Sequence, residues 1–203
     1  MEIVLVAVFS YFCGSIPFAL ILTQIFIGQD IRKIGSGNIG ATNVLRSGNK
    51  YLAFLTLILD VSKGYIPVLL TKQFFPELLQ LSALLAFLGH LFPIWLKFKG
   101  GKGVATFLGI LFALSYGLAA LFIFTWLTVS LIFKYSSLSS IFSSLTVFII
   151  TLITEKVTFA INPNTYEKGD LKLLLFIILI LIIFTHRKNI SKLKNGTEQK
   201  IKL

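Results

Sequence analysis

The chain has 203 residues, of which 56% are hydrophobic and only 13% are charged, and its formal net charge is +11. This composition excludes an ordinary water-soluble domain, because so few polar side chains cannot cover its surface, and it indicates an integral membrane protein. The basic residues flank apolar runs. We therefore expect anionic lipid and anionic substrates as partners, and no nucleic acid.

Apolar runs that suggest helical crossings of the bilayer recur along the chain. They lie at residues 3–25, 51–71, 78–96, 104–115, 117–134, 138–155 and 171–186. The run at 104–115 is short, and only Ser115-Tyr116-Gly117 separates it from the next, so one long helix over both would leave six spans. With no internal repeat or linker visible, we predict an all-α polytopic membrane protein with a single transmembrane domain over residues 1–203.

The placement of lysine and arginine favours seven transmembrane helices over six, because these residues accumulate on the cytoplasmic side of short loops. With seven spans, the basic clusters after residues 25, 96 and 133 and the basic tail fall on one side. The other side receives only Lys72, Lys156, Lys168 and Lys172. This predicts an N-terminus outside, a cytoplasmic C-terminus, an extracytoplasmic loop at 156–169, and a solvated basic tail over 189–203.

A glycine-rich polar segment, residues 35–46, lies between the first two apolar runs. It matches the pattern G-x-G-x-x-G, but neither the preceding strand nor the surrounding βαβ unit of a dinucleotide site is present. Backbone without side chains can bring N–H groups close to an anion, and Arg46 adds a bidentate donor. The other candidate phosphate ligands here are Ser36, Gly37, Asn38, Thr42 and Asn43. The alternative is a flexible positive-inside loop.

A second cluster, Lys97 to Gly103, combines paired glycines with three lysines before an apolar helix. It is not a Walker A loop, since Leu96 and Gly103 occupy positions that would require glycine and serine or threonine. An electropositive helix start nevertheless favours phosphate. Candidates are Lys99, Gly100, Gly101 and Lys102, and the alternative is a charged interfacial turn.

Asp60, Lys63 and His90 are ionisable residues inside the second and third apolar runs. An intramembrane residue such as His90 is functional by default, although a hydrogen-bonded structural histidine is the alternative. Asp60 and Lys63 are three residues apart, on one helical face, so Lys63 could extend into a phosphate site or simply neutralise Asp60. Two histidines and one cysteine, without clustered carboxylates, predict no metal and no cofactor.

Three separated motifs carry a family resemblance. They are Ser36-Gly37-Asn38 with Thr42-Asn43 and Arg46; Gly89-His90 with Lys99-Gly100-Gly101-Lys102-Gly103; and His186-Arg187-Lys188-Asn189-Ile190 with Gly196-Thr197-Glu198. Together they resemble the bacterial acyl-phosphate:glycerol-3-phosphate acyltransferases of the PlsY type. The His-x4-Asp pair of acyltransferases that use acyl-CoA or acyl carrier protein is absent, since Trp95 and Ser191 stand where it would need aspartate.

The resemblance implies seven transmembrane helices, three cytoplasmic motifs, and acyl transfer from acyl phosphate to the sn-1 hydroxyl of glycerol 3-phosphate. It also implies a multi-pass protein of the bacterial inner membrane, and we expect a monomer. Ser36 and Arg46 match the family's essential serine and arginine, and Glu198 matches a structural glutamate. The predicted catalytic set is Ser36, Arg46, His90, Lys102 and Asn189, with His186 and Lys63 among the substrate ligands.

Two alternatives to direct acyl transfer stay open at the level of the sequence. A hydroxyl nucleophile such as Ser36 could form an acyl-enzyme. An anion or phosphate-ester transporter would also place electropositive loops among membrane helices. A permeation path, however, requires polar residues at mid-membrane and on both sides, whereas these cluster on one predicted face.

Overall fold

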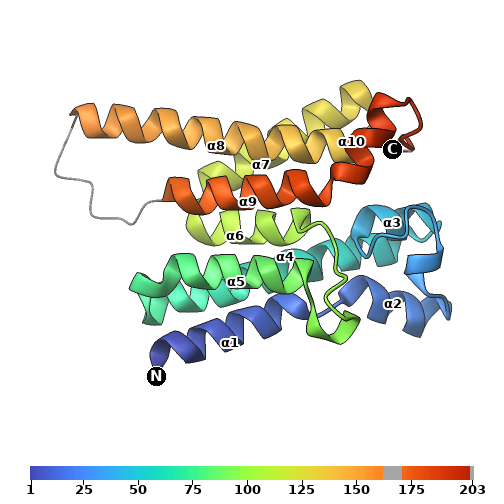
Figure 1. The fold of residues 1–203 in the computed structure, drawn as a ribbon, viewed down its shortest axis with the longest axis horizontal. Coiled ribbons are helices and arrows are strands. Elements are labelled where there is room, and N and C mark those ends of the chain that lie inside the picture. Colours follow the sequence, from blue (N-terminus) through green and yellow to red (C-terminus); the bar gives the residue numbers. More distant parts are fainter. Residues whose placement is uncertain (162–170, 202–203) are drawn as a thin grey trace. The chain divides into compact units, whose positions relative to one another are not determined.

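The computed structural model describes residues 1–161 and 171–201, and the regular structure in these ranges is helical throughout. The helices form two compact units, Met1–Ser115 and Tyr116–Leu203, which are taken here one at a time (Figure 1). The predicted all-α membrane fold is therefore confirmed, while the single domain over 1–203 stays a prediction.

The first unit contains the helices that surround the two glycine-rich segments. In chain order they are α1 (Glu2–Ser15), α2 (Phe18–Ile27), η1 (Ile31–Lys33), α3 (Ala41–Arg46), α4 (Lys50–Phe74), η2 (Pro76–Leu78), α5 (Leu79–Leu91), η3 (Ile94–Leu96) and α6 (Val104–Leu114). Helix α4 packs against α6, α5 and α1, and α1 packs against α5. The second unit contains α7 (Tyr116–Phe133), α8 (Ser136–Ile161), α9 (Leu171–Thr185) and α10 (Arg187–Lys194).

Each predicted apolar run contains a helix, but not every helix is long enough to cross a bilayer. Within the described residues, five segments meet the length and hydropathy of a span: Glu2–Ile27, Lys50–Phe74, Pro76–Leu96, Tyr116–Phe133 and Ser136–Thr154. The pair α9 and α10, bent by 56°, would add a sixth. Helix α6 is apolar but has only 11 residues. Since Ser115 is extended (φ −161°, ψ 121°), α6 and α7 are separate helices.

The first predicted span is broken near its middle. Helix α1 ends at Ser15 and α2 begins at Phe18, with Pro17 between them, because proline has no amide to continue the helical ladder. The Lys63 ammonium on α4 donates a hydrogen bond to the Ile16 carbonyl oxygen at 2.8 Å. One of the carbonyls released by the break therefore has a charged partner inside the bundle.

Glycines bring the helices of the first unit into close backbone contact. A Cβ at Gly109 of α6 would overlap the Val61 carbonyl of α4, and one at Gly64 of α4 would overlap the Thr106 carbonyl of α6. Small residues of this kind allow membrane helices to pack closely. Gly64 lies 14 residues after the first residue of α4, about 21 Å along its axis. The start of α6 is thus near the middle of α4, far from its polar end.

The second unit is organised around the serine-rich face of α8. Ser139, Ser140, Ser143 and Ser144 are buried, and each hydroxyl donates to the carbonyl four residues earlier. This internal bonding gives the hydrogen of each hydroxyl an acceptor within α8. The Trp126 indole of α7 donates to the Ser140 hydroxyl at 3.2 Å, which links the two helices.

The basic tail differs from the predicted solvated segment. It forms α10 and then turns back, so that the Ile201 amide donates to the Lys134 carbonyl oxygen at 2.7 Å and the Ile201 side chain is buried. The prediction is wrong for this part of the tail, because the apolar side chain of Ile201 is buried instead of solvated. Of the loop predicted at 156–169, the first residues belong to α8, and residues 162–169 lie outside the described residues.

Candidate functional site

The first glycine-rich segment folds as a compact loop between α2 and α4. Ser36 is exposed, and its backbone amide donates to Oδ1 of Asn43 at 2.8 Å. Arg46 ends α3, and a Cβ on Gly35 would lie 3.6 Å from both Cβ and Cδ of Arg46. The arginine stem therefore runs along the backbone beside Ser36. Gly37 has a left-handed backbone (φ +70°), a conformation in which glycine avoids the strain of a side chain.

Asn38 and Thr42 are both half-buried in this loop. An added Cβ on Gly40 would lie 3.1 Å from the Asn38 side-chain amide, so Asn38 folds over the start of α3. These contacts hold the loop in one conformation. They favour the interpretation of the segment as a phosphate-binding loop over the alternative of a flexible loop.

An ion pair precedes the loop. The Arg32 guanidinium donates to both carboxylate oxygens of Asp30, with a shortest distance of 2.7 Å. These hydrogen bonds lower the pKa of the Asp30 carboxyl from 3.8 to about 2. Arg32 therefore has an anionic partner within the protein.

The second glycine-rich loop packs tightly against the end of α5. The amide of Gly100 donates to the Leu91 carbonyl oxygen at 3.0 Å, and the amide of Gly101 donates to the His90 carbonyl oxygen at 3.2 Å. These two amides, expected as phosphate donors, therefore have backbone acceptors. A Cβ on Gly100 would also overlap the His90 and Leu91 carbonyls, so glycine is required here for close approach.

The two loops meet at Gly101. A Cβ on this residue would overlap Nε2 of His90 and would lie 3.1 Å from the Ile39 carbonyl oxygen of the first loop. His90 is buried beneath this contact. The structure thus brings the 35–46 loop, His90 and the 97–103 loop together at this residue.

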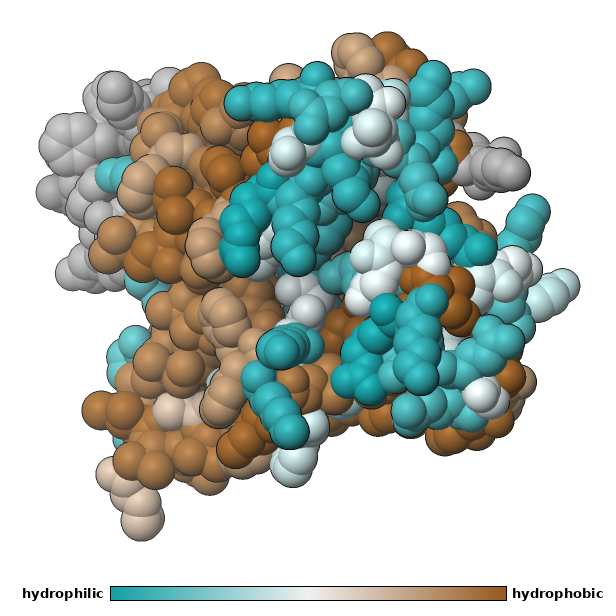
Figure 2. All heavy atoms as spheres, turned by 45° about the vertical axis from the view of Figure 1, so that its right-hand side comes forward, coloured by the Kyte–Doolittle hydropathy of each residue, from teal (hydrophilic) through white to brown (hydrophobic). Residues whose placement is uncertain are grey.

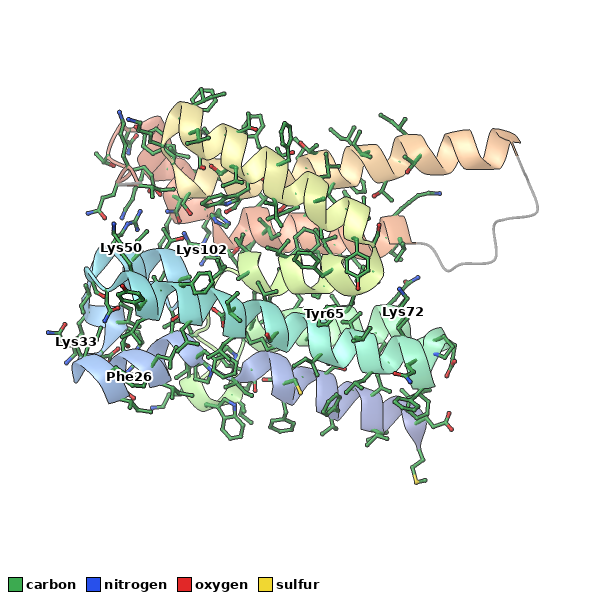
Figure 3. All side chains as sticks on the ribbon, turned by 180° about the vertical axis from the view of Figure 1, so that it is seen from behind. Phe26, Lys33, Lys50, Tyr65, Lys72 and Lys102 are labelled. Carbon is green, nitrogen blue, oxygen red and sulfur yellow. The ribbon has the colours of Figure 1, made fainter. Side chains whose placement is uncertain are left out.

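Lysines gather at the same end of the first unit. Figure 3 shows Lys33, Lys50 and Lys102 toward one end, whereas Lys72 lies at the opposite end of α4. In Figure 2 hydrophilic side chains cover the part of the first unit that carries α2 and α3, while its flanks are hydrophobic. Lys99 is exposed. This positive end is suited to collecting phosphate groups.

Lys63 is less suited to a substrate-binding role than predicted. It is buried, forms a 2.7 Å ion pair with Asp60, donates to the Ile16 carbonyl and lies 5.7 Å from the centre of the Phe18 ring. These contacts favour the alternative that the sequence left open, in which Lys63 neutralises Asp60. Its role as a phosphate ligand stays a prediction.

The third motif lies in the second unit. Asn189 of α10 donates to the Glu198 carboxylate at 2.6 Å, and the Ser137 hydroxyl of α8 donates to the same oxygen at 3.1 Å. His186 is buried, and its Nδ1 donates to the Ile182 carbonyl oxygen at 2.8 Å, because a carbonyl can only accept. Glu198 thus anchors the returning tail and orients Asn189, consistent with the structural role that the resemblance implies.

Two aromatic residues that support the second loop have no signal in the sequence. The Tyr11 hydroxyl of α1 donates to the Phe92 carbonyl at 2.7 Å, and the Trp95 indole donates to the Ser15 hydroxyl at 2.9 Å. These partners are 81 and 80 residues apart in the chain. Periodicity and spacing cannot predict contacts over such separations.

The described part of the chain offers no obvious metal centre. No three His, Cys, Asp or Glu side chains there lie close enough together to hold a metal ion. The polar groups that do converge are cationic or neutral donors, which suit anionic substrates.

Comparison with known proteins identifies the family. The family model described as glycerol-3-phosphate acyltransferase matches residues 4–196. The chain belongs to the glycerol-3-phosphate acyltransferase family. The resemblance drawn from the three motifs is therefore confirmed.

Relatives in this family match the chain over nearly its full length. The glycerol-3-phosphate acyltransferase of Pelagibacter ubique is 50% identical over 203 residues, covering 100% of both chains. That of Mesorhizobium japonicum is 48% identical over 199 residues, covering 98% of this chain and 96% of its own.

Two solved structures share the fold. The glycerol 3-phosphate form of PlsY, described as an integral membrane glycerol 3-phosphate acyltransferase, matches with a TM-score of 0.89 and 34% identity, covering 100% of this chain and 96% of that one. The lysophosphatidic acid form matches with a TM-score of 0.85 and 33% identity, covering 98% and 95%. Both matches support an integral membrane protein built from several apolar helices.

Proposed function

We propose that this chain is a membrane acyltransferase that moves a fatty acyl group from acyl phosphate to the sn-1 hydroxyl of glycerol 3-phosphate. The products are lysophosphatidic acid and inorganic phosphate, in phospholipid biosynthesis. The observation that carries the proposal is the meeting of the two glycine-rich loops at Gly101, in a family whose solved member has glycerol 3-phosphate and lysophosphatidic acid forms.

The reaction requires little covalent chemistry from the protein. An acyl phosphate is a mixed anhydride, so the hydroxyl oxygen bonds to the carbonyl carbon while the bond from that carbon to the phosphate oxygen breaks. The hydroxyl proton passes to a phosphate oxygen. The protein's main task is to hold two anions together and align them, which accounts for large rate gains without a protein base.

The residue roles follow from charge and position. Arg46, Lys102 and Ser36 gather the phosphates and stabilise the developing oxyanion. The roles proposed for Asn189 and His186 rest on the family motif alone. His90 supports the second loop from beneath through its contact with Gly101. Because the Gly100 and Gly101 amides have carbonyl acceptors, these two glycines contribute through close packing.

The depth of the second loop supports a site below the membrane surface. Helix α6 has 11 residues, about 16 Å, against a hydrocarbon layer of about 30 Å, and the loop before it folds back onto the His90 and Leu91 carbonyls at the end of α5. The loop that joins α5 and α6 therefore reaches into the bilayer depth crossed by α4. Non-helical backbone at that depth is tolerated where it lines a polar cavity or is covered by protein.

The finer topology also belongs to this proposal. We infer seven spans in the inner membrane of a bacterium, with α6 as the short fourth span, the N-terminus outside, and the active site and C-terminus on the cytoplasmic side. The chain acts as a monomer within the lipid bilayer. The asymmetric placement of lysine and arginine supports this arrangement.

Purified protein incubated with acyl phosphate and glycerol 3-phosphate tests the activity directly. We expect lysophosphatidic acid and phosphate in equal amounts. Arg46→Ala and Lys102→Ala should each reduce turnover at least about tenfold, near 1.4 kcal/mol of barrier. Lys72→Ala is the control, because this lysine lies at the opposite end of α4 and is outside the proposed ligand set (Figure 3). Normal turnover in both Arg46 and Lys102 variants would contradict the assigned roles.

The acyl-enzyme route through Ser36 predicts a different result. A covalent intermediate would exchange labelled phosphate into acyl phosphate when glycerol 3-phosphate is absent. Direct transfer predicts no such exchange and no acyl label on Ser36. The transporter alternative has no support among the proteins compared, which are described as acyltransferases.

A further inference from the structure

The Asn43 side chain of the first loop is buried and fully hydrogen-bonded. Asn43 is only 1% exposed and is the third residue of α3. Its amide nitrogen donates to the Ile31 carbonyl oxygen at 3.1 Å and to the Ile34 carbonyl oxygen at 3.0 Å. Its Oδ1 accepts the Ser36 amide at 2.8 Å.

These three bonds use both N–H groups of the Asn43 amide. An asparagine side chain has two donors and one carbonyl oxygen, so no donor is left for a substrate phosphate. These hydrogen bonds argue against the predicted role of Asn43 as a phosphate ligand. The side chain instead ties three points of the loop backbone to α3.

The same helix carries Arg46, three residues after Asn43, and residues at this spacing lie on one helical face. Gly35 packs into the corner between them. A Cβ there would overlap Oδ1 of Asn43 and contact the stem of Arg46. Asn43 thus controls how the Ser36 backbone lies relative to the Arg46 side chain.

We propose that Asn43 is a positioning residue, which sets the geometry of Ser36 and Arg46 for acyl transfer without touching either substrate. This inference rests on the proposed function for its catalytic meaning. The structural part of the inference is that Asn43 fixes the loop conformation at Ser36. This part can be tested by an experiment that does not measure enzyme activity.

Asn43→Asp is the sharpest variant, because it keeps the size and the acceptor of asparagine but removes both donors at neutral pH. A carboxylate would face the Ile31 and Ile34 carbonyl oxygens. We expect kcat to fall at least about thirtyfold at pH 7.5, with KM for glycerol 3-phosphate changing less than about threefold. A protonated carboxyl regains one donor, so activity relative to the unaltered protein should rise as the pH falls toward 5, whereas Asn43→Ala should show no such rise.

Asn49→Asp is the matched control. The Asn49 side chain accepts the Leu52 amide at the start of α4, and aspartate can make the same bond. We expect activity within about twofold of the unaltered protein and no pH-dependent recovery. Full activity of Asn43→Asp, or equal pH profiles for Asn43→Asp and Asn43→Ala, would overturn the proposal.

A chemical readout separates this inference from the proposed function. In a Cys13→Ala background, which removes the chain's one cysteine, Ser36→Cys can be labelled with a maleimide. Adding Asn43→Asp should raise the labelling rate about tenfold, because the loop loses its tie to α3, while adding Asn49→Asp should not. An unchanged rate overturns the positioning role. If the unaltered protein shows no acyl transfer but the labelling rates change as expected, only the proposed function is contradicted.

Discussion

Gly101 and His90 are in direct contact at the base of the candidate site. The Gly101 amide donates to the His90 carbonyl oxygen at 3.2 Å, and the imidazole lies where a Cβ on residue 101 would be. The same Cβ would approach the Ile39 carbonyl of the first loop. One missing side chain therefore allows three segments of the chain to meet.

Gly101→Ala should consequently disturb both activity and stability. The added methyl overlaps the buried His90 ring, and overpacking of this kind costs about 1–3 kcal/mol. We expect turnover to fall at least about tenfold and the melting temperature in detergent to drop. Adding His90→Ala to Gly101→Ala should recover part of the melting temperature; no recovery would contradict the contact.

Lys63→Met tests the buried ion pair. Removing the ammonium leaves Asp60 buried without its partner and removes one of the two donors to the Ile16 carbonyl, a loss of about 3–5 kcal/mol in the free energy of unfolding. The double variant Asp60→Asn with Lys63→Met removes both charges and should be more stable than Lys63→Met alone. Denaturant unfolding in detergent measures both. Equal losses in the single and double variants would argue against a coupled pair.

Glu198→Ala should release the returning tail. Asn189 and Ser137 both donate hydrogen bonds to the Glu198 carboxylate. Losing these two bonds should lower the free energy of unfolding by about 1–3 kcal/mol and leave Asn189 without its orienting partner. We expect turnover to fall at least about tenfold, with a lower melting temperature. Glu198→Gln keeps an acceptor oxygen and should retain most of the activity. If glutamine is as damaging as alanine, the negative charge, rather than the hydrogen bond, is what the site requires.

The ion pair before the first loop predicts a dependence of stability on acid. The pKa of Asp30 is about 2 in the folded protein, below its ordinary value of 3.8, with hydrogen bonding by Arg32 as the main cause. A lowered folded pKa adds stability that is fully present above about pH 4 and is lost as the pH falls through 2. Because the pair is partly exposed, the contribution is at most about 1 kcal/mol. Asp30→Asn should lower the free energy of unfolding at pH 7 by at most about 1 kcal/mol and should flatten its pH dependence between pH 4 and 2. A steep slope that persists between pH 4 and 2 would exclude this pair as its source.

The sequence by itself determined the class of this protein. Membrane helices depend on the length and hydropathy of a continuous run, which are local properties, so each predicted run contains a helix and the break at Ser115 separates α6 from α7. The three motifs were also sufficient for the family, because their residues and order are specific. Charge placement predicts the topology, which stays a prediction.

Only the tertiary structure decided what individual residues do. Asn43 looks like a phosphate ligand in the sequence, and its buried amide instead holds the backbone at Ile31, Ile34 and Ser36. Lys63 is a candidate for the site by composition, but its contact with Ile16, 47 residues away, places it at the break in the first span. Such partners depend on how the helices pack. A local pattern of residue types cannot predict which backbone group will lie opposite a side chain.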